Sequence, residues 1–150
     1  METIKVAILG ASGYTGIELV RLLLAHPHAQ ITAATSRASA GNRIDEMFPR
    51  FAHLTGSELS FMEPDMEAVA RTGAKIAFLA LPHGTAADYA NELLAKGIRV
   101  IDLSADFRLR EASTYEEFYG GTHPAPDLLQ QAIYGLPEVY SREIANASLV

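Results

Sequence analysis

The sequence contains no cysteine among its 150 residues, which excludes a disulfide framework, a thiolate metal site and a cysteine nucleophile within the chain. No apolar run approaches the roughly 18 residues that span a bilayer, and the amino terminus lacks the features of a signal peptide. The 12 Lys and Arg residues are outnumbered by 18 Asp and Glu, giving a formal net charge of −6 that argues against broad nucleic-acid affinity. We therefore expect a cytoplasmic, soluble domain with neither a nucleic-acid nor a membrane partner.

The most informative feature that is present lies at the amino terminus. An apolar, partly β-branched run over Ile4–Leu9 leads directly into Gly10, Gly13 and Gly16, and a helical pattern follows. Glycine suits a sharp turn and a backbone that must approach a ligand closely. A helix that starts in such a turn directs free N–H groups and its positive dipole end at a phosphate. The pattern favours a dinucleotide site, and a purely structural tight turn is the alternative.

The end of the next predicted strand, residues 30–35, bears on which dinucleotide is bound. A site for NAD usually carries Asp or Glu there, which binds the ribose 2′-hydroxyl. Here Ser36 and Arg37 follow the strand, and no acidic residue occurs between Glu18 and Asp45. A hydroxyl and a guanidinium can bind a 2′-phosphate that a carboxylate would repel. The pattern favours NADP(H) over NAD, unless Arg37 is an ordinary solvated loop arginine.

Strand and helix patterns alternate along most of the chain. Strands are predicted at 4–9, 30–35, 58–61, 75–81 and 99–103, and helices after the glycine turn, at 65–71 and at 86–96. Short helices are expected near 44–48, 115–119, 127–132 and 138–145. This order predicts an α/β fold: a Rossmann-type, doubly wound, mostly parallel sheet with helices on both faces.

Two loops that leave predicted strands carry chemically capable side chains. The first contains Pro82, His83 and Gly84, a combination that suits close backbone approach to a ribose or a nicotinamide ring. His83 either contacts the cofactor or only packs at the start of the next helix. Because ligands of open α/β sheets bind at the carboxyl ends of the strands, this loop is a candidate part of the site.

The second loop contains Ser104, Asp106 and Arg108. Arg108 could bind a phosphate or a carboxylate through both arms of its guanidinium, and a surface ion pair with Asp106 or a glutamate is the alternative. The remaining histidines show no metal-ligand spacing, and we expect them to be structural or solvated, with no metal site: His26, His28, His53 and His123.

Four segments together resemble the N-acetyl-γ-glutamyl-phosphate reductases of arginine biosynthesis: residues 10–16 (GASGYTG), 81–84 (LPHG), 102–108 (DLSADFR) and 134–138 (YGLPE). The match spans the whole chain in order. Aspartate-β-semialdehyde dehydrogenases share the fold and the glycine turn, but the second half of the third segment and the fourth segment favour the reductases.

The resemblance implies an NADPH-dependent reduction of an acyl phosphate. A cysteine thiolate displaces phosphate, hydride then reduces the thioester to N-acetylglutamate semialdehyde, and a histidine acts as general acid and base. It places Gly10, Ser12, Gly13, Tyr14, Thr15 and Gly16 at the pyrophosphate, Ser36 and Arg37 at the 2′-phosphate, Pro82, His83 and Gly84 at the nicotinamide ribose, and Ser104 and Arg108 on the substrate side.

The catalytic cysteine of that family lies in an Asn-Pro-Gly-Cys-Tyr-Pro-Thr motif, a few residues after a strand that follows the YGLPE segment. Residues 148–150 resemble the start of that strand. We therefore expect residues 1–150 to be the NADP-binding domain, with the cysteine, the histidine and the catalytic and dimerisation domain beyond Val150. Alone it would be inactive, and the whole enzyme a homo-oligomer. The alternatives are an aspartate-semialdehyde dehydrogenase-type reductase domain and a non-catalytic NADP-sensing module.

Overall fold

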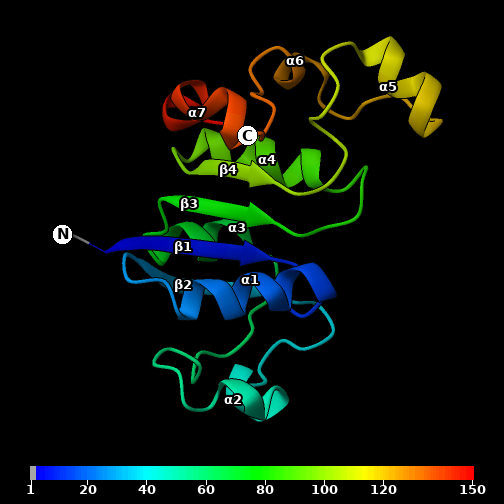
Figure 1. Ribbon diagram of the computed structural model, residues 1–150. Helices are drawn as coiled ribbons and strands as arrows, with labels where there is room; N and C mark the ends of the chain where they lie inside the picture. Colours follow the sequence, from blue (N-terminus) through cyan, green and yellow to red (C-terminus); the bar gives the residue numbers. More distant parts are fainter. Residues whose placement is uncertain (1–2) are drawn as a thin grey trace.

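A computed structural model describes residues 3–150, in which four strands form one parallel sheet in the order β2-β1-β3-β4 (Figure 1). The strands are β1 (Ile4–Leu9), β2 (Ala29–Thr35), β3 (Ile76–Leu79) and β4 (Arg99–Asp102). The helices that connect them along the sheet are α1 (Tyr14–Leu24), α3 (Met66–Arg71) and α4 (Ala86–Ala95). The predicted Rossmann-type sheet is confirmed.

The sheet separates two hydrophobic clusters, as the alternation of side chains along β1 illustrates. Val6 and Ile8 belong to the cluster with α1, whereas Ala7 and Leu9 belong to the cluster with α3 and α4. Successive strand residues point to opposite faces, so a strand covered on both sides is apolar throughout rather than alternating. The helices therefore lie on both faces, as the sequence predicts.

Five further helical segments lie outside this central unit. The excursion between β2 and α3 contains α2 (Ile44–Met47) and the 3-10 helix η1 (Pro49–Phe51), and the chain after β4 contains α5 (Ala112–Tyr119), α6 (Pro126–Leu129) and α7 (Pro137–Asn146). Arg99 of β4 holds the last of these, because its guanidinium donates to the carbonyl oxygens of Ile144, Ala145 and Ala147 at 2.8–3.1 Å. This contact satisfies carbonyls at a helix end that no later turn can reach.

The strand predicted at 58–61 does not form. Ser60 makes only an isolated antiparallel bridge with Arg43, and Met62 makes an isolated parallel bridge with Thr35. The backbone around Phe61 pairs instead with the loop at 41–44 of its own excursion, and the Phe61 ring is buried with 2% of its surface exposed. The apolar residues of this segment therefore pack into the hydrophobic cluster on the α1 face of the sheet, and the segment does not form a fifth strand.

The order of the strands fixes where a ligand can bind. From β1 the chain first adds β2 on one side and then crosses to place β3 on the other. The loops that leave β1 and β3 therefore diverge at the carboxyl edge of the sheet. Such a switch point opens a crevice, and it is the usual ligand position in open α/β sheets.

Candidate functional site

Two of the three glycines in the segment 10–16 are required by the fold itself. Gly10 has φ +77°, and a Cβ there would lie 2.3 Å from the carbonyl oxygen of Ala80. A Cβ on Gly16 would lie 2.1 Å from the carbonyl oxygen of Gly10 and 2.6 Å from Cα of Ala11. Both glycines therefore permit close contact between backbone segments, and neither position has room for a side chain.

Gly13 differs from the other two. It has extended backbone geometry, and the only atom within 4 Å of a Cβ placed on it would be the carbonyl oxygen of Gly10 at 3.5 Å. It precedes α1, whose first intrahelical bond runs from the N–H of Ile17 to the Gly13 carbonyl at 2.8 Å. No side chain caps α1 and its first turn holds no acid, and Gly13, Tyr14 and Thr15 at its start are exposed. A phosphate fits this cradle.

The end of β2 is bonded directly to the glycine loop. Thr35 accepts hydrogen bonds from the N–H of Gly10 at 3.4 Å and of Ala11 at 2.9 Å, through its hydroxyl and its carbonyl. The hydroxyl oxygens of Ser12 and Ser36 lie 2.7 Å apart. The sequence-predicted pyrophosphate loop and the predicted 2′-phosphate residues are therefore adjacent.

Arg37 is exposed beside this contact, and its guanidinium donates to the Tyr89 hydroxyl of α4 at 2.8 Å. A cleft of about 190 Å³ brings Gly10, Ser36, Arg37 and Pro82 together, along with Leu9, Thr35, Pro64, Leu81, Thr85 and Tyr89. Sequence reasoning missed Tyr89, because in a helical pattern it is indistinguishable from a half-buried packing residue. Its phenol oxygen restricts the directions in which the Arg37 guanidinium can point.

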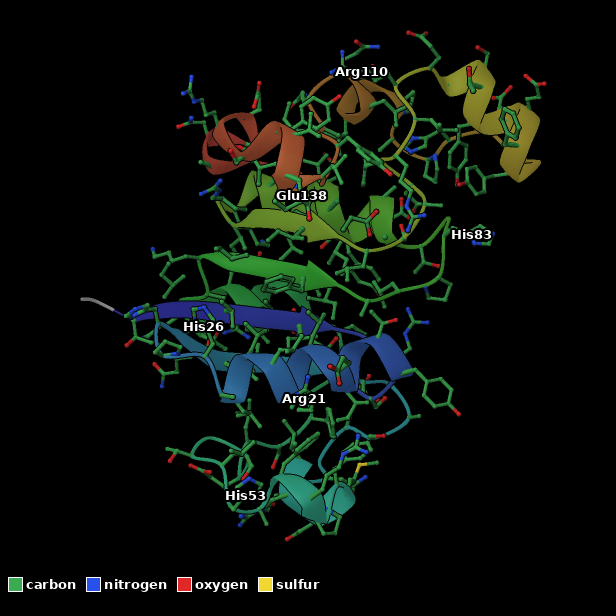
Figure 2. All side chains as sticks on the ribbon, viewed as in Figure 1. Arg21, His26, His53, His83, Arg110 and Glu138 are labelled. Carbon is green, nitrogen blue, oxygen red and sulfur yellow. The ribbon has the colours of Figure 1, made fainter. Side chains whose placement is uncertain are left out.

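The loop after β3 lies at the same edge of the sheet. His83 is exposed, extends away from the sheet in Figure 2, and has its ring centroid 5.9 Å from that of Tyr119. Gly84 adopts φ +79°, a conformation that residues with a side chain rarely adopt. A Cβ on Gly84 would meet no atom within 4 Å, so its space is open to a ligand.

Asp106 is the main connection between this loop and the loop after β4. Its carboxylate is fully buried and accepts from the N–H of Gly84 at 2.7 Å, the N–H of Ala87 at 3.1 Å and the hydroxyl of Tyr115 at 3.2 Å. It thus occupies the start of α4, where a negative charge is favourable. Burial, and then the charge of Asp106, raise the pKa of Tyr115, so its hydroxyl remains a donor.

His123 supports the backbone of Asp106. Its Nδ1 accepts from the N–H of Ala125 at 3.0 Å, so its Nε2 carries the proton and donates to the Asp106 carbonyl at 2.7 Å. The ring is 2% exposed. The expectation that His123 is structural agrees with this geometry. The role of Asp106 was missed, because no local pattern reveals which helix start a loop carboxylate will reach.

Ser104 and Arg108 lie in a different cleft, of about 540 Å³, together with Asp102, Tyr134 and Gly135 among its lining residues. The Ser104 hydroxyl donates to Asp102 at 2.6 Å and accepts from the N–H of Asp106 at 3.1 Å, so it is committed to its own loop. Burial raises the pKa of Asp102. Residues from two of the segments that resemble the reductases, 102–108 and 134–138, nevertheless line this cleft together.

Arg108 is exposed and bonded only weakly to the protein. Its guanidinium donates to the Leu103 carbonyl at 3.3 Å. The alternative of an ion pair with Asp106 is wrong, because that carboxylate is turned inward to the start of α4. Within residues 3–150, Arg108 makes no ion pair with a glutamate either. The guanidinium is therefore available to a ligand in this cleft.

Residues 3–150 contain neither a metal-binding cluster nor a membrane-spanning helix. No group of three or more His, Asp or Glu side chains is arranged to hold a metal ion. No helix within residues 3–150 has the length and apolar character needed to cross a membrane.

Comparisons with known proteins relate the chain to a family of dinucleotide-binding domains. Residues 5–147 match the family model described as semialdehyde dehydrogenase, NAD binding domain. The chain is 55% identical over 150 residues to the N-acetyl-gamma-glutamyl-phosphate reductase of Akkermansia muciniphila, which covers 100% of this chain and 43% of the relative. It is 53% identical over 150 residues to that of Ectopseudomonas mendocina, covering 98% of this chain and 42% of the relative. The chain thus spans less than half the length of these relatives.

Solved structures support the fold. Aspartate semialdehyde dehydrogenase II of Vibrio cholerae matches with a TM-score of 0.64 at 18% identity, covering 99% of this chain and 41% of that one. Aspartate semialdehyde dehydrogenase of Candida albicans, solved with NADP, matches with a TM-score of 0.60 at 19% identity, and the match covers 81% of this chain and 40% of that one. At such identities the agreement concerns the architecture.

Proposed function

Because this chain belongs to the semialdehyde dehydrogenase NAD-binding domain family, we propose that it is the NADP(H)-binding domain of an N-acetyl-γ-glutamyl-phosphate reductase. The observation that carries the proposal is the uncapped start of α1 at Gly13, bonded through Ser12 to Ser36 and lying beside Arg37. This arrangement provides hydrogen-bond donors for a phosphate at two adjacent points, the start of α1 and the end of β2. No acidic side chain stands at the end of β2 to favour a free 2′-hydroxyl.

Different residues of the chain bind different parts of the proposed cofactor. The N–H groups that follow Gly13 bind the pyrophosphate, Ser36 and Arg37 bind the 2′-phosphate, and the loop Pro82–Gly84 borders the nicotinamide ribose. Bound NADPH supplies the hydride of the proposed reaction. Arg108 holds the phosphoryl group of the acyl phosphate in the second cleft, because a guanidinium fork matches its oxygens. Ser104 acts there by shaping the loop, since its hydroxyl is already bonded.

The remaining parts of the reaction belong to the portion of the relatives that this chain does not match. The chain has no cysteine to form a thioester. We assign the cysteine, the general acid-base histidine and the substrate domain to that portion, and a homo-oligomeric state to the whole enzyme.

The purified 150-residue chain is accordingly expected to bind NADPH without oxidising it. Binding would be followed by the change in NADPH fluorescence, and turnover by loss of its absorbance in the presence of acyl phosphate. The physical reason is that the chain has no cysteine to form the thioester, and the one hydroxyl that is bonded to a carboxylate within the predicted site, that of Ser104, is buried and a weaker nucleophile than a thiolate. Acyl-phosphate-dependent oxidation of NADPH by the chain alone would contradict the assignment.

Arg37→Ala is expected to weaken NADP binding by about 10-fold to 100-fold, the effect of losing one charge-assisted hydrogen bond of roughly 1.5–3 kcal/mol. NAD binding should hardly change, because NAD lacks the 2′-phosphate. Titration calorimetry with both dinucleotides measures this directly. Tyr89→Phe is the matched control, since it removes the partner of Arg37 at 2.8 Å and leaves the cation. Equal losses for NADP and NAD in Arg37→Ala would remove Arg37 from the 2′-phosphate site.

A further inference from the structure

The glycine loop also borders a cleft on its other side. This cleft measures about 350 Å³ and is lined by Ser12, Gly13, Tyr14, Ile17, Phe48 and Arg50. The first four residues belong to the loop and to α1, whereas Phe48 and Arg50 come from the excursion that contains α2 and η1. Figure 1 shows this excursion reaching past α1, away from the sheet. A residue far from the glycine motif in sequence is therefore placed beside it.

Arg50 is held in position by aromatic rings. Its guanidinium carbon lies 4.9 Å from the ring centroid of Phe51 and 5.9 Å from that of Phe48. Phe51 is 2% exposed, and Phe48 packs edge-on against Phe61 with the centroids 6.4 Å apart. A cation over such rings is attracted to them, and a fixed platform reduces the entropy lost on binding a ligand.

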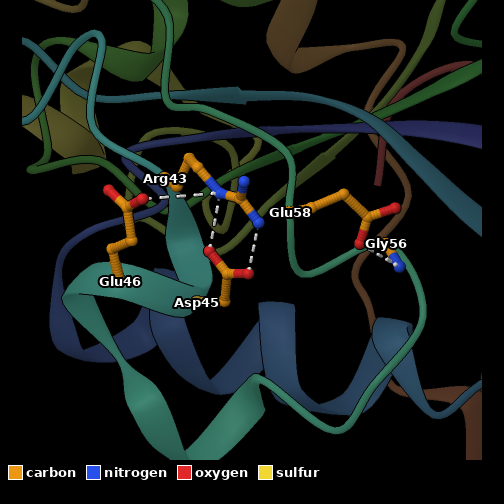
Figure 3. A network of polar contacts seen from close by, with 5 residues as sticks. All are labelled: Arg43, Asp45, Glu46, Gly56 and Glu58. Carbon is orange, nitrogen blue, oxygen red and sulfur yellow. Dashed lines mark hydrogen bonds and ion pairs between the residues drawn. The ribbon is translucent and has the colours of Figure 1, made fainter.

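The charge of Arg50 is not neutralised by a neighbouring acid. Arg43 of the same excursion differs, because it pairs with Asp45 at 2.6 Å and with Glu46 at 3.8 Å (Figure 3). Arg50 makes no ion pair with any residue in 3–150. Glu18 of α1 feels the charge of Arg50, which contributes to lowering its pKa, but Glu18 pairs with Arg21 instead.

We propose that Arg50 binds a phosphate of the dinucleotide at the start of α1, as a second cation in addition to Arg37. The inference rests on the proposed function. Two phosphates of the proposed cofactor are candidates. Gly13, the proposed pyrophosphate residue, lines the same cleft as Arg50, and Ser36, a proposed 2′-phosphate residue, is bonded to Ser12 of that cleft. A guanidinium and the free N–H groups at the start of a helix can both donate hydrogen bonds to the same phosphate, from two directions.

The test compares Arg50→Gln with Arg43→Gln, which removes one positive charge from the same excursion. Titration calorimetry with NADP and with NAD is expected to give about a tenfold or larger loss for Arg50→Gln and little change for Arg43→Gln. A loss confined to NADP assigns Arg50 to the 2′-phosphate, and equal losses assign it to the pyrophosphate. Arg50→Lys should recover part of the affinity, because it keeps the charge without the fork.

Thermal melting of each variant separates binding from folding, and because Arg50 is exposed we expect the Arg50→Gln variant to melt close to the wild type. If Arg50→Gln binds both dinucleotides as tightly as the wild type, or loses no more affinity than Arg43→Gln, the inference is overturned while the proposed function stands. If the wild-type chain binds neither dinucleotide, the proposed function fails and this inference fails with it.

Discussion

Gly13→Val is expected to lower the affinity for NADP by at least about 100-fold, because losing two or more charge-assisted hydrogen bonds costs roughly 3 kcal/mol or more. The two methyl groups would cover the N–H groups at the start of α1, where we propose that the pyrophosphate binds. Stability should change little, since a Cβ on Gly13 meets only the Gly10 carbonyl, at 3.5 Å. Valine is a poorer N-cap residue than glycine, which accounts for a loss of only about 1 kcal/mol.

Gly16→Ala provides the matched comparison three residues further on. Its Cβ would meet the Gly10 carbonyl oxygen at 2.1 Å, so backbone must move. We expect a loss of about 3 kcal/mol or more, or a melting temperature lower by about 6–12 °C. Calorimetric melting and NADP titration of both variants check the pair. A Gly13→Val variant that melts as low as Gly16→Ala yet binds NADP normally would make Gly13 a structural glycine.

Asp106→Ala is expected to destabilise the chain by about 3–5 kcal/mol, because it leaves buried donors without an acceptor. The buried donors are the N–H group of Ala87 and the hydroxyl of Tyr115, and the N–H group of Gly84, an exposed residue, loses the same acceptor. Urea unfolding gives the free energy, and amide hydrogen exchange at Gly84 and Ala87 should become faster. The loop that carries His83 would lose its connection to the loop after β4.

Asp65→Ala is the control for this effect. Asp65 also accepts two N–H groups at a helix start, from Glu67 at 2.8 Å and Ala68 at 3.2 Å, but it is exposed. Water can replace its carboxylate as the acceptor, so we expect the free energy of unfolding to fall by about 1 kcal/mol. The destabilisation by Asp106→Asn should lie between those of Asp106→Ala and Asp65→Ala. An amide keeps one acceptor oxygen, but its NH₂ group faces another hydrogen-bond donor. Equal losses for Asp106→Ala and Asp65→Ala would contradict the role of burial.

The glycine loop is the part of the site that the sequence determined most completely. An apolar run, glycines at 10, 13 and 16 and an amphipathic helix are all local patterns, and each restricts the backbone within a few residues. The choice of Ser36 and Arg37 as neighbours of this loop follows from the same reasoning, because parallel strands end at one edge of a sheet. The hydroxyl contact between Ser12 and Ser36 agrees with that placement.

Other features were decided only by the tertiary structure. The segment 58–61 has the composition of a strand, but it pairs within its own excursion. Ser104 has the hydroxyl of a binding residue, but Asp102 and the N–H of Asp106 engage it. Asp106 reaches the start of a helix about twenty residues earlier in the chain, and Arg50 reaches a glycine loop nearly forty residues earlier. These roles depend on which distant segments meet when the chain folds, and a pattern with a period of two or 3.6 residues describes only neighbours along one element.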